Sequence, residues 1–352
     1  MFIVGLGTAV PPNQYTQAQC WEAVKKAEQF ARLDSRARAT LWKVLQHENG
    51  IHTRSLALDS LDEVFVADPD TLHRRFTRHA PALASQAAVN ALRQTGHRPR
   101  DIDAVIVSTC TGYLCPGLTS YVMERLGLRP EVLALDLVGQ GCGAALPNLR
   151  AAEALLSARR CETVLSICVE VCSAAFYIDN DPGVLISACL FGDGAGAAVL
   201  AVAPNKEGRR VEWKAARSLH NPAERDALRF EWRGGMLRNI LTSPVPRLAA
   251  QHAKLVLDEV LSSVEMSSGE IDAWILHAGG RKVLDELQAS LGLTAAHVHW
   301  SGKVLSEFGN LSSPFVFFTL QAALRENAPP GWWWMSSFGA GFSCHGALLR
   351  VA

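Results

Sequence analysis

The sequence has no apolar run of about eighteen residues or more, the length that a membrane-spanning helix needs, so we expect no integral membrane contact. It also lacks net charge, because 34 basic residues balance 34 acidic ones. Bulk electrostatics therefore gives no argument for a nucleic-acid partner. Residues 1–5 show neither the basic start nor the cleavage site of a signal peptide.

The nine cysteines are an odd number, and none of them falls in a C-x-x-C motif. A disulfide framework or a zinc site is therefore not expected, and the reducing cytoplasm is the better interpretation of the compartment. The glycine-rich segment 192–196 lacks the G-x-x-x-x-G-K-[ST] pattern, which excludes a phosphate-binding loop of that type.

What is present is a compact composition, 49% hydrophobic and 19% charged, and a sequence that repeats itself. Residues 102–107 and 271–276 are similar apolar runs, and each follows a helical stretch. The glycine-rich segment 191–196 is echoed by residues 338–342, and each echo is followed by another apolar run. The repetition indicates two copies of one α/β unit.

The strand candidates are continuous apolar runs, typical of sheets covered on both faces. They are residues 132–138, 163–169, 195–202 and 271–276. The helical stretches 144–158 and 312–324 are apolar enough to be buried. Two halves, 1–205 and 206–352, with buried central helices predict an α/β fold of five layers, α-β-α-β-α. The polar segment 204–235 is interpreted as their connection.

The first candidate for chemistry is Cys142, between Gly141 and Gly143 where a strand gives way to an apolar helix. Unpaired N–H groups and the helix dipole at such a place favour a thiolate and lower the cysteine pKa. The two glycines leave space for a substrate carbonyl. The alternative is a buried structural cysteine, a common fate of free cysteine.

The second and third candidates are His277, at the carboxyl end of a buried strand, and Asn310, at the start of the second half's buried helix. Each has an ordinary alternative: His277 as a histidine of the core, and Asn310 as the N-cap of the helix. Asn310 is the repeat counterpart of the Cys142 turn, and ligands collect at strand ends in α/β folds. We therefore group the three residues as one catalytic constellation.

Four motifs carry a resemblance to a known family. They are Gly141-Cys142, Leu190-Phe191-Gly192-Asp193-Gly194, His277 with Gly279-Gly280, and Gly309-Asn310-Leu311-Ser312-Ser313. Together they resemble the type III polyketide synthases, the chalcone synthase-like enzymes, over nearly the whole chain. The resemblance implies a thiolase-like fold and a homodimer.

The resemblance also implies a reaction. Cys142 would accept an acyl group from a starter acyl-CoA and pair as a thiolate with His277. His277 and Asn310 would stabilise the thioester oxyanion while malonyl-CoA loses CO₂, and the enolate would attack the Cys142 thioester. Repeated condensation and cyclisation would give a phenolic or pyrone product without a metal or redox cofactor.

Further substrate-binding residues follow from the same resemblance. Phe191 would be a gatekeeper, and Ser312 would line the cavity. Cys110, Cys172 and Ala175 would replace the family's cavity threonines, and Ser187 would replace a glycine on the cavity floor. Cys115 would reach into the neighbouring subunit. The two cavity cysteines resemble those of bacterial members such as tetrahydroxynaphthalene synthases. We therefore expect a product other than a chalcone and a reshaped cavity that admits a fatty acyl starter. Residues 229–241 offer no recognisable counterpart of the family's second gatekeeper phenylalanine.

Three alternatives stay open at this point. One is a condensing enzyme similar to ketoacyl-ACP synthase III, which uses a carrier protein. Another is a papain-like hydrolase with the same Cys-His-Asn order, although the papain cysteine motif is absent. The third is a non-enzymatic scaffold with the same fold.

Overall fold

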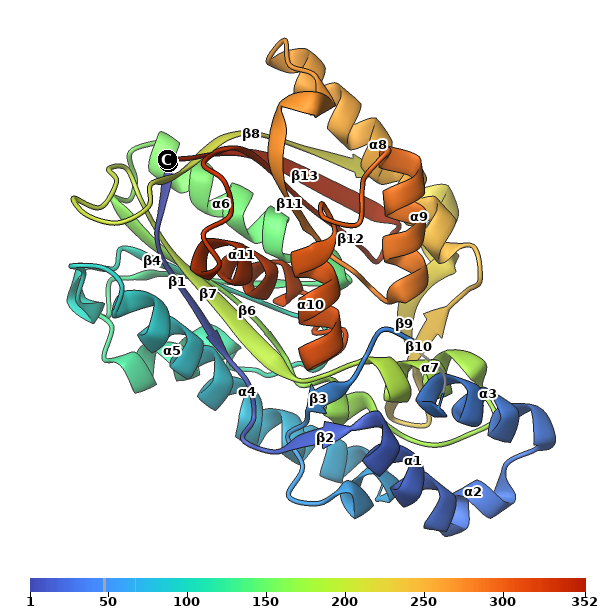
Figure 1. Cartoon of the computed structure of the whole chain (residues 1–352). Helices are drawn as coiled ribbons and strands as arrows, with labels where there is room; N and C mark the ends of the chain where they lie inside the picture. Colours follow the sequence, from blue (N-terminus) through green and yellow to red (C-terminus); the bar gives the residue numbers. More distant parts are fainter. Residues whose placement is uncertain (47–48, 67) are drawn as a thin grey trace.

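The computed structural model describes residues 1–46, 49–66 and 68–352. Its centre is a nine-stranded mixed sheet in the order β11-β12-β13-β8-β1-β7-β6-β4-β5 (Figure 1). The strands are β1 (Phe2–Ala9), β4 (Ala104–Thr109), β5 (Leu133–Val138), β6 (Thr163–Glu170), β7 (Gly194–Ala201), β8 (Val211–His220), β11 (Ile271–Leu276), β12 (Gly331–Gly339) and β13 (Ser343–Val351). Two-stranded sheets are formed by β2 (Gln14–Thr16) with β3 (Thr53–Ser55) and by β9 (Leu228–Arg233) with β10 (Met236–Leu241).

The helices cover the sheet in layers or form a lobe beside it. They are α1 (Gln17–Lys26), α2 (Glu28–Arg32), α3 (Ser35–Gln46), α4 (Pro69–Leu92), α5 (Leu118–Leu126), α6 (Ala145–Ser157), α7 (Pro182–Leu190), α8 (Val245–Ser263), α9 (Arg281–Leu291), α10 (His299–Phe308) and α11 (Phe315–Arg325). Figure 1 shows α6 and α11 between the two halves of the sheet, with α4 and α5 outside one half and α8 and α9 outside the other.

Three hydrophobic clusters match these layers. Side chains of α6 and α11 form one cluster with both half-sheets, while α4 and α5 pack on β4, β6 and β7 and α8 and α9 pack on β11 to β13. The half-sheets meet where Phe2 pairs with Glu212 and Ile3 with Val211. The five-layer α/β prediction is confirmed.

Most predicted elements are present with small shifts. The run 271–276 is β11, and the apolar stretches 144–158 and 312–324 become α6 and α11, both with buried faces. The boundary between halves at 205/206 falls between β7 and β8 and stays a prediction.

The interpretation of residues 204–235 as a mere connection was wrong, because this segment contains β8 and β9. In β8, Val211, Trp213 and Ala216 are buried while charged side chains lie between them. Such mixed patterning is typical of a strand with one covered face, and a search for continuous apolar runs misses it.

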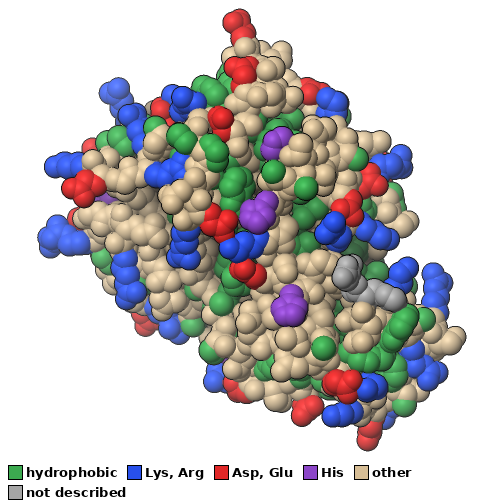
Figure 2. Space-filling view, viewed as in Figure 1, with side chains coloured by type: hydrophobic (Ala, Val, Ile, Leu, Met, Phe, Trp, Pro, Cys, Tyr) green, Lys and Arg blue, Asp and Glu red, His purple; other side chains and the backbone are tan. Residues whose placement is uncertain are grey.

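A helical lobe that the sequence analysis did not predict lies beside the sheet. Side chains of α1, α3 and α7 share one buried cluster there. Lys and Arg side chains lie among Asp and Glu over the face drawn in Figure 2, in line with the balanced composition. Within the described residues, no helix has both the length and the apolarity to cross a membrane.

Candidate active site

Cys142 lies in a single 3₁₀ turn, Gly141–Gly143, between β5 and α6. The predicted strand–turn–helix setting is confirmed, but the cysteine precedes the helix, which begins at Ala145. The thiol is surrounded by protein, and this burial raises the pKa of Cys142 to about 12. The predicted lowering of its pKa was wrong, because desolvation outweighs the nearby donors.

The glycines beside Cys142 serve backbone packing. A Cβ at Gly141 would lie 2.8 Å from the Ala340 nitrogen, and one at Gly143 would lie 3.1 Å from the Gly339 nitrogen. The end of β12 therefore occupies the space that we had assigned to a substrate carbonyl. This contact fixes the Cys142 turn against the second half of the chain.

Ser312 connects the two halves at the sulfur. Its Oγ donates a hydrogen bond to Cys142 Sγ at 3.1 Å and lies 3.6 Å from Cys110 Sγ. The Cys142 side chain also packs against a buried cluster that includes Cys172 and Phe191. Ser312 and Cys110, both predicted as substrate-binding residues, thus lie near the Cys142 sulfur, and Cys172 and Phe191 belong to the cluster beside it.

His277 follows β11 directly and is 1% exposed. Its ring packs against Phe315 and Phe338, with centroid distances of 5.2 and 5.1 Å. Neither ring nitrogen has a hydrogen-bond partner among the described residues. The expected hydrogen bond between His277 and Cys142 is therefore not formed. The alternative, a core histidine whose ring nitrogens are hydrogen-bonded, does not hold either. Burial lowers the pKa of His277 to about 3, so the imidazole is neutral at physiological pH.

Asn310 makes hydrogen bonds to the other segments that carry candidate residues. Its Nδ2 donates to the Gly279 carbonyl at 3.0 Å, and its Oδ1 accepts from the Ser312 N–H at 2.9 Å. Its backbone forms a β-bridge with Phe191. Asn310 is not the N-cap of α11, because that helix begins at Phe315 after Pro314. The residues that carry the Cys, His and Asn side chains therefore converge through Asn310 and Ser312.

An inner cavity of about 20 Å³ lies beside Ser312. Five predicted residues line it, namely Cys172, Ala175, Ser187, Phe191 and Ser312. The sequence analysis missed five others, namely Thr111, Phe176, Val184, Phe230 and Asn239. This volume holds about one water molecule, so a bound acyl group requires side chains to move.

An outer cleft of about 350 Å³ reaches the turn that carries Cys142, since Gly139 and Gly141 line it. Cys110 lines this cleft rather than the inner cavity where we had placed it. Phe230 lines both spaces and therefore forms part of the wall between them. Cys115 is exposed on the loop after β4, as a residue available to a neighbouring subunit must be.

Glu170 is a buried carboxylate beside the site that the sequence analysis missed. It accepts hydrogen bonds from Ser313 Oγ at 2.5 Å, Thr111 Oγ1 at 2.9 Å and the Cys110 N–H at 3.0 Å. Burial raises the pKa of the Glu170 carboxyl, and these donors oppose that shift. The sequence did carry a signal for this residue, because Glu170 is an acidic side chain directly after the apolar run 163–169.

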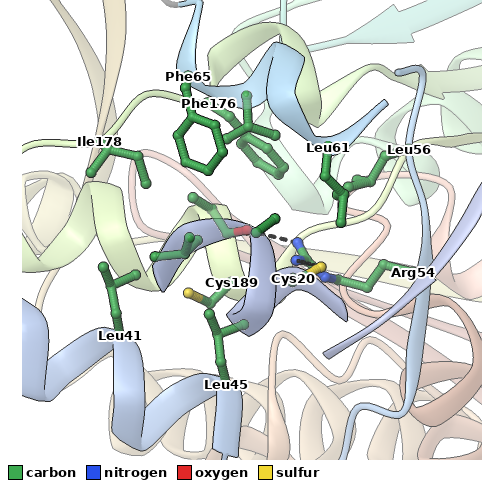
Figure 3. Close-up of a pocket in the computed structure, with 14 residues that line it drawn as sticks. Cys20, Leu41, Leu45, Arg54, Leu56, Leu61, Phe65, Phe176, Ile178 and Cys189 are labelled. Carbon is green, nitrogen blue, oxygen red and sulfur yellow. Dashed lines mark hydrogen bonds between the residues drawn. The ribbon is translucent and has the colours of Figure 1, made fainter. Parts of the chain in front are cut away.

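A second small pocket, of about 30 Å³, lies in the helical lobe (Figure 3). Its lining is apolar apart from Arg54, whose guanidinium donates to the carbonyls of Ala188 and Phe191 at 2.7 and 2.8 Å. Arg54 thereby holds the end of α7 and the backbone of Phe191. Phe176 lines both this pocket and the inner cavity.

No group of three His, Cys, Asp or Glu side chains in the described ranges is arranged to hold a metal ion. All nine cysteines lie in those ranges and are free thiols.

Comparisons with known proteins agree over nearly the whole chain. Residues 11–225 match the family described as FAE1/Type III polyketide synthase-like protein, and residues 223–351 match the C-terminal domain of chalcone and stilbene synthases. A 3,5-dihydroxyphenylacetyl-CoA synthase of Streptomyces toyocaensis is 29% identical over 361 residues, which cover 99% of this chain and 89% of the relative.

Two further similarities bear on fold and chemistry. The alpha-pyrone synthesis polyketide synthase-like Pks18 of Mycobacterium tuberculosis is 29% identical over 335 residues, which cover 92% of this chain and 84% of that protein. The crystal structure of PKS-I from the brown alga Ectocarpus siliculosus superimposes with a TM-score of 0.90 at 25% identity, covering 99% of this chain and 98% of that one.

Proposed function

This chain belongs to the type III polyketide synthase family, and we propose that Cys142, His277 and Asn310 carry out its reaction. As a member of that family it is an acyltransferase with a thiolase-like fold that condenses CoA thioesters into a phenolic or pyrone product. The observation that carries the residue assignment is the convergence of three segments through Asn310 and Ser312, beside a histidine whose buried ring nitrogens have no partner in the described part of the chain.

The first step loads the starter. Cys142 Sγ attacks the thioester carbonyl carbon of an acyl-CoA, the new S–C bond forms, and CoA leaves with the thiol proton. The outer cleft brings the CoA thioester to the Cys142 turn, which it reaches at Gly141. The Ser312 hydroxyl stabilises negative charge on the sulfur, because it already donates to Sγ.

The second step forms the nucleophile. Malonyl-CoA loses CO₂, and the electron pair of the broken C–C bond makes an enolate whose oxygen needs hydrogen-bond donors. A neutral imidazole supplies one N–H, and the Asn310 amide has a second N–H beyond the one given to Gly279. The enolate carbon then attacks the Cys142 thioester, and the Cys142 thiolate is released.

The inner cavity determines which starter the enzyme accepts. The small apolar side chains in the lining of the inner cavity are Cys172, Ala175 and Val184, and they support our proposal of a fatty acyl starter over a bulky aromatic one. A long chain needs more than the present 20 Å³, and Phe176 is the wall that would have to turn to open the helical-lobe pocket. A panel of acyl-CoAs with malonyl-CoA tests this, and turnover with aromatic starters alone would exclude it.

Free CoA thioesters are the substrates that family membership supports, rather than the carrier-protein thioesters of the alternative. Product formed from acyl-CoA and malonyl-CoA without carrier protein is the expected result. Intact mass spectrometry should show the starter on Cys142. If no acyl group appears on that residue, the assignment of the nucleophile is wrong.

We propose a homodimer that acts in the cytoplasm and needs no cofactor. Support for the dimer comes from β5, the edge strand of the large sheet, where Leu133 is 42% exposed. Tyr113, on the loop that also carries Cys115, is 65% exposed. Unpaired edges with apolar side chains are typical of interfaces. Light scattering should give twice the 38.1 kDa chain mass for the native protein and the chain mass for Leu133→Lys.

A further inference from the structure

We propose that Asn239 selects the growing chain by hydrogen bonding to oxygen atoms of the poly-β-keto intermediate. The proposal rests on the proposed function and concerns what the inner cavity recognises after the starter is loaded. Asn239 lies in β10 directly opposite Phe230 of β9, and both side chains line the inner cavity. The hairpin β9–β10 therefore presents one aromatic ring and one amide to that space.

The orientation of this amide follows from its neighbours. Ser187 Oγ donates to the Gly183 carbonyl at 2.6 Å, so its hydroxyl proton is in use. Asn239 Nδ2 lies 2.7 Å from the same oxygen and must donate to it. The amide nitrogen consequently faces Ser187, and the carbonyl oxygen faces another direction.

One N–H and the carbonyl oxygen of Asn239 remain available. The bond to Ser187 is the side-chain hydrogen bond that this amide makes within the described residues. Asn239 is 6% exposed, so the amide faces the inner cavity with little contact to bulk water. A bound molecule that offers both an acceptor and a donor completes the hydrogen bonding of this amide.

The surroundings make this amide selective. Cys172, Ala175, Val184, Phe191 and Phe230 provide apolar lining and packing area. An alkyl chain gains nothing from the Asn239 amide and leaves it unpaired. A poly-β-keto chain carries keto oxygens that accept from N–H and enol hydroxyls that donate to the amide carbonyl. Asn239 therefore favours the extended, oxygen-rich intermediate over the saturated starter.

The strand is also well placed to hold the amide still. The next residue back, Arg238, forms ion pairs with Asp181 at the start of α7 and with Glu231 of β9. Ser187 is part of the same helix α7. The hairpin is thus anchored to α7 at two neighbouring positions, which keeps the amide fixed while intermediates change.

The test uses Asn239→Leu, which removes hydrogen bonding at similar volume, and Asn239→Asp, which keeps the shape but loses the N–H donors. Hexanoyl-CoA and malonyl-CoA are the substrates, with Cys142 acylation read by intact mass and products by chromatography and mass spectrometry. Each variant loses one or two neutral hydrogen bonds to the intermediate. We therefore expect the ratio of cyclised, multiply extended product to diketide released early to fall about tenfold. Acylation of Cys142 is measured in parallel and should remain detectable in both variants, since the sulfur and its Ser312 donor are unchanged.

Thr242→Val is the matched control, because the Thr242 hydroxyl donates to the Ala227 carbonyl at 2.9 Å beside the same hairpin but outside the cavity. It should leave the product ratio unchanged. An unchanged ratio in both Asn239 variants overturns the proposal, and so does loss of Cys142 acylation in both, which would make Asn239 a folding residue. If the native protein forms no acyl-enzyme or product at all, the proposed function fails instead.

Discussion

The hydroxyl of Ser312 donates to the sulfur of Cys142 at 3.1 Å, although 170 residues separate them in the chain. One residue belongs to the half that carries the nucleophile and the other to the half that carries His277 and Asn310. Both halves are therefore needed to set the reactivity of one thiol. The same Ser312 is placed by the Asn310 amide, which accepts its backbone N–H.

Replacing Ser312 with Ala should make Cys142 less reactive. The hydrogen bond stabilises the thiolate, so its loss raises a pKa that burial has already raised to about 12. At fixed pH below that value, alkylation of Cys142 by iodoacetamide should slow by about tenfold. In the native protein the rate should rise about tenfold per pH unit between pH 7 and 9, as the thiolate fraction does.

Peptide mass spectrometry after alkylation separates Cys142 from the exposed Cys115. Ser263→Ala is the control, because that hydroxyl bonds the Val260 carbonyl in α8, away from the site. Equal alkylation rates for native protein and Ser312→Ala would mean that the bond does not tune the thiol.

Replacing Cys142 with Ala should abolish condensation but retain decarboxylation of malonyl-CoA. The sulfur is needed to hold the growing chain, whereas the enolate requires only oxyanion donors. Release of CO₂ and product formation are measured in parallel. Cys161→Ala, at a buried cysteine in the α6 cluster, should keep both activities. Loss of folding in Cys142→Ala would instead support a structural cysteine.

Replacing His277 with Ala should reduce both activities, by roughly two to three orders of magnitude for the loss of one oxyanion donor. No inflection from His277 is expected in the pH–rate profile between pH 5 and 8, because burial lowers its pKa to about 3. His252→Ala is the control, since His252 lies in α8 and packs against Phe342, outside the site. An activity loss confined to condensation would contradict a role in making the enolate.

How much of this site could be predicted depends on the range of the interactions. The Cys142 turn and β11 were found because local patterns, two glycines and an unbroken apolar run, determine them. Glu170 was missed because its donors come from residues up to 143 positions away. Asn239 was missed because a strand pairing with Phe230, and not local sequence, brings it to the cavity. The prediction of a lowered pKa for Cys142 was wrong because the second half of the chain buries the thiol, and this tertiary effect has no local sequence signal.

Replacing Glu170 with Gln should destabilise the fold. The carboxylate accepts from Ser313, Thr111 and the fixed N–H of Cys110, and an amide would direct its own NH₂ group toward such donors. The free energy of unfolding should fall by about 1–3 kcal/mol in urea titrations. The exposed Glu207→Gln should change it by less than about 0.5 kcal/mol. Equal losses in the two variants would contradict the hydrogen-bond argument.

Acid should weaken the fold through two buried histidines. His277 and His345 are each 1% exposed, and burial lowers the pKa of both to about 3, against 6.5 for an exposed histidine. The unfolded chain binds their protons first as the pH falls below 6.5, so stability is lost between that pH and about 3. From pH 7 to pH 5 each histidine should remove about 2 kcal/mol from the free energy of unfolding.

The raised pKa values of Glu170 and Asp193 act in the opposite direction, because these carboxyls hold protons in the folded state at a pH where the unfolded chain has lost them. Their contribution is the same in the native protein and in a histidine variant, so the difference between the two isolates the histidine. Urea titrations from pH 5 to 8 should show that His277→Leu loses about 2 kcal/mol less than the native protein on acidification, with a similar gain for His345→Leu. Parallel stability curves for native protein and both variants would show that these rings take up protons without unfolding.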